Sequence, residues 1–205
     1  MITHRYAEAA AFAAKCHLGQ VRKGAGTPYI AHPMAVSALV LAFGGDEDQA
    51  IGALLHDVVE DCGVTYGEIR RRFGGFVAEI VGYATDGVPD GAGRKEPWKK
   101  RKTAYLEQLL DDPAPALLVI ACDKLNNAES IAADLDGEAG VAVFERFTAT
   151  AAETAWYYRE IAGIMIVRGA DLPPDLVARM VRAVARIQRG AEEVRTGQAA
   201  ELLPA

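Results

Sequence analysis

The chain has 205 residues, of which 51% are hydrophobic and 24% are charged, and its net charge at pH 7 is −6. This composition is typical of a globular chain with one sizeable core, and the acidic balance argues against a general nucleic-acid-binding protein, whose surface carries an excess of basic residues. Apolar runs of about 18 residues, the length that spans a membrane, do not occur, and the first residues lack the pattern of a signal peptide. We therefore expect a cytoplasmic protein that binds neither nucleic acid nor membrane.

Three cysteines are present, at positions 16, 62 and 122. Their number is odd and no Cys-x-x-Cys spacing occurs, which argues against a disulfide framework and against a zinc site built from thiolates. We expect them to be small core residues.

The apolar residues recur with the helical period, and no segment alternates convincingly with period two, so we expect an all-α fold. Asp46 is a candidate N-cap, Thr65 with Glu68 has the spacing of a capping box, and Gly-Gly pairs at 44–45 and 74–75 separate helices. The predicted helices span residues 5–18, 32 to the glycines at 44–45, 46–61, 65–73, a short segment ending near 85, 97–110, 114–133, 141–168 and 173–195.

Residues 51–61, Ile-Gly-Ala-Leu-Leu-His-Asp-Val-Val-Glu-Asp, are the stretch around which we expect the site to form. On a regular helix its apolar residues fall on one arc and four polar residues fall on another. These polar residues are His56, Asp57, Glu60 and Asp61. Gly52 and Ala53, one turn earlier, are expected to leave space above them. An acidic cluster against an apolar stripe is costly unless a positive group is held there, although an ordinary surface helix has the same pattern.

A metal site follows if three predicted helices converge. His32 lies at the start of the second helix, and Asp123 lies on the helix over 114–133, where Asn127 and Ser130 point within about 60° of it. Two imidazoles, from His32 and His56, with the carboxylates of Asp57 and Asp123 form a mixed nitrogen and oxygen site. Such a site suits manganese or iron(II), and zinc remains possible.

Basic residues gather in two places. Arg22 and Lys23 lie in a loop over residues 19–29, indicated by its glycines and proline. A second basic run, Trp-Lys-Lys-Arg-Lys at 98–102, opens a predicted helix after an exposed loop. We interpret this run as a solvated helix face.

Several motifs occur together in the order and spacing of one known family. They are Gln-Val-Arg-Lys-Gly at 20–24, Thr-Pro-Tyr-Ile-Ala-His-Pro at 27–33, Ala-Leu-Leu-His-Asp-Val-Val-Glu-Asp at 53–61, Arg-Phe-Gly at 72–74, Thr-Asp at 85–86 and Asp-Lys-Leu-Asn-Asn at 123–127. Between about residues 5 and 165 the chain resembles the HD-domain guanosine alarmone hydrolases, which form the hydrolase half of RelA/SpoT proteins. It looks most like the free-standing small alarmone hydrolases.

This resemblance implies an HD-domain helical bundle with residue roles at matching positions. His32, His56, Asp57 and Asp123 would bind one manganese ion, and Glu60 and Asp61 would position or deprotonate the attacking water. The positions that contact the nucleotide are Arg22, Lys23, Asn127 and Ser130. The implied reaction removes the 3′-diphosphate of guanosine tetra- or pentaphosphate, giving GDP or GTP and pyrophosphate.

Some features depart from the family pattern or lie outside it. Asn126 stands where these proteins usually have His or Tyr, and Glu129 stands where many have Arg. We expect an HD-type domain over residues 1–168, followed by an amphipathic helix and tail at 169–205 that belongs to the same domain or contacts a partner, such as a second copy of the chain. Two alternatives to the alarmone hydrolase stay open: a phosphohydrolase of another nucleotide or phosphoester, and a nucleotide-binding regulatory module without turnover.

Overall fold

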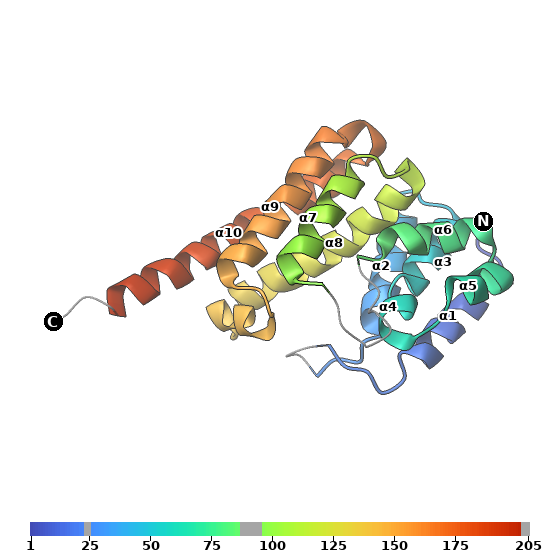
Figure 1. Cartoon of the computed structure of the whole chain (residues 1–205), viewed down its shortest axis with the longest axis horizontal. Helices are drawn as coiled ribbons and strands as arrows, with labels where there is room; N and C mark the ends of the chain where they lie inside the picture. Colours follow the sequence, from blue (N-terminus) through green and yellow to red (C-terminus); the bar gives the residue numbers. More distant parts are fainter. Residues whose placement is uncertain (23–25, 87–95, 202–205) are drawn as a thin grey trace.

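The computed structural model describes residues 1–22, 26–86 and 96–201, and all regular elements in these ranges are helices (Figure 1). They are α1 (His4–Cys16), α2 (Ala31–Ala42), α3 (Glu47–Leu55), α4 (Val58–Cys62), α5 (Tyr66–Phe73), α6 (Gly75–Ala84), α7 (Trp98–Leu109), α8 (Ala114–Asp136), the 3₁₀ helix η1 (Gly140–Arg146), α9 (Ala151–Val167), the 3₁₀ helix η2 (Gly169–Asp171) and α10 (Pro174–Glu201). The only extended pairing in these ranges is one antiparallel bridge between Val21 and Pro28. The all-α prediction is therefore confirmed.

Side-chain caps explain several helix starts. Asp46 and Gln49 form a reciprocal capping box at α3, and the Thr65 hydroxyl accepts the Glu68 amide at α5. Each cap satisfies an amide that the first helical turn leaves without a partner. Both N-caps were predicted from the sequence.

The prediction of one continuous helix through residue 61 is wrong, because the chain turns at His56 and Asp57 between α3 and α4. Nδ1 of His56 lies 2.7 Å from the carbonyl oxygen of Ala53. In an uninterrupted helix that carbonyl would accept the amide of residue 57, so the imidazole competes with the helical hydrogen bond. The turn has a further effect. The side chains of successive residues in a regular helix point about 100° apart, whereas those of His56 and Asp57 here point toward each other.

The single helix predicted over residues 141–168 is also wrong. The chain forms η1, leaves helical geometry at Phe147, and restarts as α9 with Thr150 as its N-cap. Thr150 and Glu153 make a reciprocal capping box, with the Thr150 amide 2.9 Å from the Glu153 carboxylate. The Thr-Ala-Ala-Glu sequence at 150–153 carries the signal for this start, because Thr and Glu have capping-box spacing.

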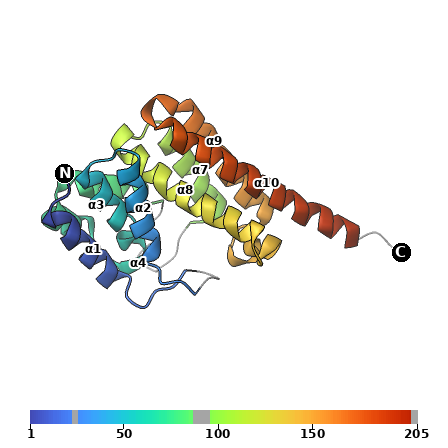
Figure 2. The same ribbon diagram turned by 180° about the vertical axis from the view of Figure 1, so that it is seen from behind.

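The long helix α8 lies at the centre of the bundle. It packs against α2, α3 and α6 on one side of the molecule and against α9 and α10 on the other (Figures 1 and 2). Its first half is buried from Ala116 to Asp123. A second apolar cluster joins α1, α3, α5 and α6. Burial of α3 and α8 thus holds His56, Asp57 and Asp123 inside the fold.

Helix α10 adds to the core and then continues past the bundle toward the C-terminus (Figure 2). Leu176, Met180 and Ile187 are fully buried against α8 and α9. The division of the chain after residue 168 stays a prediction. No helix in the described ranges has both the length and the apolar composition to cross a membrane.

Gly52 permits close contact between α3 and α6. A Cβ atom added to Gly52 would lie 2.6 Å from Cγ2 of Ile80, much closer than van der Waals contact. The expectation that Gly52 leaves open space above the polar residues is therefore wrong: the missing side chain is replaced by Ile80.

Candidate metal centre and adjoining cleft

Three separate parts of the chain supply the four predicted metal ligands. His32 is the second residue of α2, His56 and Asp57 form the turn between α3 and α4, and Asp123 lies midway along α8. Both histidines and Asp123 are buried, with 5% exposure or less. The fold thus brings together the four side chains that the sequence singled out.

His32, His56 and Asp57 place ligand atoms within 4.8 Å of one another, as one bound cation requires, and Asp123 lies beside both histidines. Nε2 of His56 lies 3.0 Å from Oδ2 of Asp57 and 3.5 Å from Oδ1 of Asp123. Nε2 of His32 lies 3.1 Å from the same Asp123 oxygen and 3.7 Å from the same Asp57 oxygen. Atoms bound at about 2.0–2.2 Å to one ion, about 90–110° apart, are themselves separated by about 3–3.6 Å. The observed distances fall close to this range.

The hydrogen bonds of both imidazoles leave Nε2 available as a ligand atom. Nδ1 of His56 faces a carbonyl oxygen, and Nδ1 of His32 lies 2.8 Å from Oδ1 of Asn126. Because these oxygens are acceptors, each Nδ1 carries a proton, and each ring directs its Nε2 into the cluster. Nε2 of His56 is buried without a hydrogen-bond partner in the described part of the chain. An orphaned nitrogen between two carboxylates is the arrangement that a cation completes.

The charges of the cluster are strongly coupled. Burial lowers the pKa of His56, but Asp57 and Asp123 outweigh burial and hold it well above its usual value. Burial raises the pKa of Asp57, while the charge of His56 brings it below its usual range. Burial also raises the pKa of Asp123, but the charge of Lys124 outweighs burial and holds it well below its usual value. Both carboxylates are therefore ionised and present negative charge to the centre.

Tyr29 is a neighbour of the cluster that sequence analysis did not assign. Its hydroxyl donates a 2.6 Å hydrogen bond to Oδ2 of Asp57. Burial, and then the charge of Asp57, raise the Tyr29 pKa, so the hydroxyl keeps its proton. Its place in the Thr-Pro-Tyr motif, three residues before His32, is the only sequence signal that marks it.

Glu60 and Asp61 both border the cluster, on α4. Asp61 lines a large cleft beside the ligands, whereas Glu60 lines a smaller cavity that also contains Asp57 and Asp123. The catalytic role assigned to this acidic pair stays a prediction.

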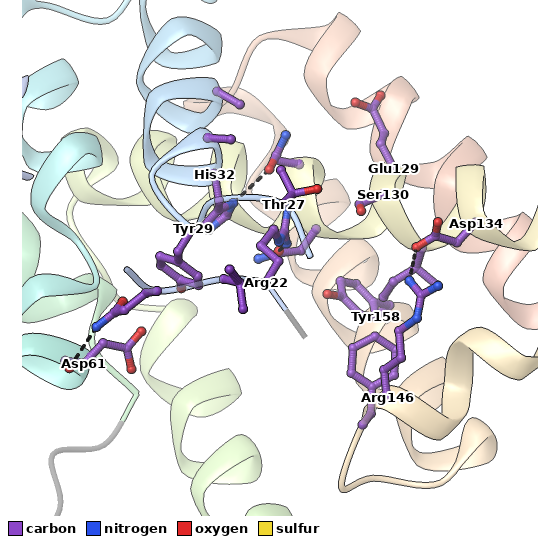
Figure 3. Close-up of a pocket in the computed structure, with 18 residues that line it drawn as sticks. Arg22, Thr27, Tyr29, His32, Asp61, Glu129, Ser130, Asp134, Arg146 and Tyr158 are labelled. Atoms are coloured by element: carbon purple, nitrogen blue, oxygen red, sulfur yellow. Dashed lines mark hydrogen bonds and ion pairs between the residues drawn. The ribbon is translucent and has the colours of Figure 1, made fainter. Parts of the chain in front are cut away.

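The cleft has a volume of about 920 Å³ and runs from His32, one of the four predicted ligands, toward α9 and η1. Figure 3 shows Tyr29, His32 and Asp61 toward one side and Arg146 and Tyr158 toward the other. Arg22, Asn127 and Ser130 line it, as their predicted role in nucleotide binding requires. Lys23, predicted for the same role, lies outside the described residues.

A chain of hydrogen bonds links the cleft to the ligands. Nη2 of Arg22 donates to Oδ1 of Asn127 at 2.6 Å, and Nδ2 of Asn127 donates to Oδ1 of Asp123 at 2.7 Å. The amide therefore couples the loop arginine to the buried carboxylate, which sequence position alone did not indicate.

The two departures from the family pattern have separate structural roles. Asn126 supports His32, as described above. Glu129 makes a two-pronged ion pair with Arg179 of α10, at 2.8 and 2.7 Å. This pairing balances the charge of Glu129 at the rim of the cleft.

Sequence analysis also missed Arg146 and Tyr158 in the far wall. Nη1 of Arg146 is held by Oδ2 of Asp134 at 2.6 Å. The capping-box sequence at 150–153 could have indicated Arg146, because it predicts that a new helix starts there and that the preceding segment, η1, is separate from it.

The basic run at the start of α7 is not uniformly solvated. Lys100 is 68% exposed, but the side chains of Arg101 and Lys102 are only 16% and 15% exposed and pair with Asp86. For these two residues the interpretation as a solvated face is wrong, because Asp86 compensates their burial.

Residues 9–150 match the family model described as an HD domain. The chain therefore belongs to the HD-domain family.

Its relatives include proteins named guanosine-3′,5′-bis(diphosphate) 3′-pyrophosphohydrolase MESH1. The chain is 39% identical to the Xenopus tropicalis protein over 127 residues, covering 60% of this chain and 68% of that protein. Identity to the human protein is 38% with the same coverage. An Aquifex aeolicus guanosine-3′,5′-bis(diphosphate) 3′-pyrophosphohydrolase is 35% identical over 123 residues, which cover 58% of this chain and 17% of that much longer protein.

Solved structures support the same fold. A metazoan ortholog of SpoT, described as hydrolysing ppGpp, superposes with a TM-score of 0.71 over 93% of this chain and 98% of that chain, at 24% identity. A Listeria monocytogenes protein gives a TM-score of 0.65 over 75% of this chain and 96% of its own, at 29% identity.

Proposed function

We propose that the protein hydrolyses the 3′-diphosphate of guanosine tetra- or pentaphosphate, producing GDP or GTP and pyrophosphate. The observation that carries this proposal is the convergence of His32, His56, Asp57 and Asp123 beside a nucleotide-sized cleft, which His32 lines. The relatives named as 3′-pyrophosphohydrolases of guanosine bis(diphosphate) support this substrate class.

The four ligands would hold one divalent cation. Their mixed nitrogen and oxygen donors favour manganese, and iron(II) or zinc are the other candidates. A divalent cation there supplies charge neutralisation for the diphosphate and makes water more acidic. Asn126 and the Ala53 carbonyl contribute by fixing both histidine rings in the tautomer that offers Nε2.

In the proposed reaction, water attacks the phosphorus bonded to the ribose 3′ oxygen. A bond forms between the water oxygen and this phosphorus, and the bond from phosphorus to the 3′ oxygen breaks. One carboxylate of the Glu60 and Asp61 pair accepts one proton of the water, and the departing 3′ oxygen takes up a proton from solvent. General-base assistance of this kind typically contributes about 10²- to 10⁴-fold to the rate.

The cleft residues would bind the nucleotide. The guanidinium of Arg22 reaches the cleft from the loop and is already held by Asn127. It therefore loses less conformational entropy when it binds the nucleotide. An arginine in this position can pair with phosphate through two hydrogen bonds or stack on the base. Lys23 and Ser130 complete the proposed set.

The decisive experiment offers purified, manganese-loaded protein a panel of guanosine and adenosine phosphates and separates the products by ion-exchange chromatography. We expect guanosine tetraphosphate to give GDP and pyrophosphate in equal amounts, and the Arg22→Ala variant to show a raised KM. Cleavage of another phosphoester with no hydrolysis of guanosine tetraphosphate would reassign the substrate. Binding without turnover would identify a regulatory module instead. The cytoplasmic location and a homo-oligomer stay predictions from the sequence.

A further inference from the structure

A second, smaller cavity adjoins the ligand cluster. Its volume is about 220 Å³, and His32, Asp57 and Asp123 line one part of its wall. It shares Tyr29, His32 and Asn127 with the large cleft, so His32 borders both spaces. Pockets for drug-sized ligands usually measure about 300–1,000 Å³. The nucleoside therefore fits the cleft, while the smaller cavity suits only a compact group.

The rest of the small cavity is basic. We call it the basic cavity, after the three cationic side chains in its wall, which are Arg101, Lys102 and Lys124. The first two come from α7 and the third follows Asp123 on α8. Their side chains are only 12–16% exposed, so their charges act in a partly desolvated space where electrostatic attraction is strong.

Each cation is held in place by an acid. Nη1 of Arg101 lies 2.7 Å from one oxygen of Asp86, and Nζ of Lys102 pairs with the other oxygen. Nζ of Lys124 lies 2.7 Å from Oδ2 of Asp123, whereas Oδ1 of Asp123 faces the histidines. Asp123 thus connects the cation site to the basic cavity through its two oxygens.

The basic cavity keeps a surplus of positive charge once a divalent cation balances the two ligand aspartates. Three basic side chains then face two further acids in the wall, Asp86 and Glu60. Burial and the nearby charge of Lys124 both lower the pKa of Lys102, against the attraction of Asp86. A bound anion would relieve this repulsion.

We propose that the basic cavity binds the 3′-diphosphate group of the substrate and, after hydrolysis, the inorganic pyrophosphate product. This inference rests on the proposed function, and it assigns Arg101 and Lys102 as diphosphate-binding residues. Hydrolysis divides the substrate into a large nucleotide and a compact, highly charged diphosphate. These two parts match in size the two unequal cavities that His32 separates. Guanidinium and ammonium groups bind phosphate oxygens through charge-assisted hydrogen bonds.

The test measures binding of inorganic pyrophosphate and of GDP to manganese-loaded protein by calorimetry. Arg101→Gln and Lys102→Gln should each weaken pyrophosphate binding by about 10- to 100-fold, since each removes a hydrogen bond to a charged group. Both should leave the affinity for GDP within about twofold of wild type, a change below about 0.5 kcal/mol. Arg22→Ala should instead weaken GDP binding and leave the affinity for pyrophosphate near that of wild type.

Lys100→Gln is the matched control, because Lys100 lies on the same helix but is exposed and pairs with Glu96. It should bind pyrophosphate as wild type does. If Lys102→Gln does not fold, because Asp86 loses a partner, the double variant Asp86→Asn with Lys102→Gln removes the unpaired acid and should fold and bind pyrophosphate weakly. Metal content is measured for every variant, so that loss of the cation is not mistaken for loss of the anion site.

Two results separate this inference from the proposed function. Suppose that wild type hydrolyses guanosine tetraphosphate and that the folded Arg101 and Lys102 variants keep the wild-type affinity for pyrophosphate. The assignment of the basic cavity as the diphosphate site would then be wrong, and the proposed function would stand. Wild type that binds pyrophosphate through Lys102 but does not hydrolyse guanosine tetraphosphate would confirm the anion site and overturn the function.

Discussion

Replacing Asn126 with Leu tests how the fold prepares His32 for a cation. The change removes the acceptor 2.8 Å from Nδ1 while approximately keeping side-chain volume. The free variant can shift the imidazole proton to Nε2, but cation binding forces it back to Nδ1, where no acceptor remains. An unsatisfied buried donor costs about 1–3 kcal/mol, which corresponds to about 5- to 150-fold in affinity. Loss of a hydrogen-bond partner from a metal-binding histidine typically costs about 10- to 100-fold, a consistent range.

The assay is a competition titration of manganese against a chelator of known affinity, with thermal denaturation to check the fold. Asn126→Asp is the matched control because it keeps an acceptor oxygen and should retain at least wild-type affinity. Manganese affinity within about twofold of wild type in a folded Asn126→Leu protein, a change below about 0.5 kcal/mol, would refute the tautomer argument.

Three more perturbations address catalysis and stability. Glu60→Gln and Asp61→Asn should lower kcat for guanosine tetraphosphate by about 10²- to 10⁴-fold while metal content and nucleotide affinity stay near wild type; rates within about threefold for both would show that the pair is not catalytic. Gly52→Ala should destabilise the fold by about 1–3 kcal/mol in chemical denaturation, whereas Gly163→Ala, in a helix with open space at the Cβ position, should not destabilise it. Despite burial, the charge of Lys102 lowers the pKa of Asp86, so the ionised carboxylate stabilises the fold above the ordinary carboxyl range and this contribution is lost as the pH falls through the lowered pKa. The stability difference between wild type and Asp86→Asn should therefore shrink on acidification, and a constant difference from pH 7 to 3 would contradict the pairing.

Local sequence signals determined much of the fold. The caps at Asp46 and Thr65 were readable because a capping side chain bonds to amides only two or three residues away. The helical period of the apolar residues likewise fixed the all-α class, since burial of one face needs no knowledge of the partner element. Motif spacing alone also brought His32, His56, Asp57 and Asp123 into one hypothesis.

Tertiary contacts decided what local signals did not. The turn at His56 depends on a side-chain bond to the Ala53 carbonyl that competes with the helix, and helical periodicity carries no trace of that competition. The role of Asn126 likewise depends on a contact across 94 positions.

The charged residues show the same division. The local sequence of the run at 98–102 does not tell whether it faces water or a cavity. Burial of Arg101 and Lys102 depends on Asp86, whose charge compensates the loss of hydration. The sequence by itself therefore determined which residue types are available for the chemistry. The packing of α8 between the two halves of the bundle decided which of them meet, because convergence of distant side chains is a property of long-range contacts and not of local pattern.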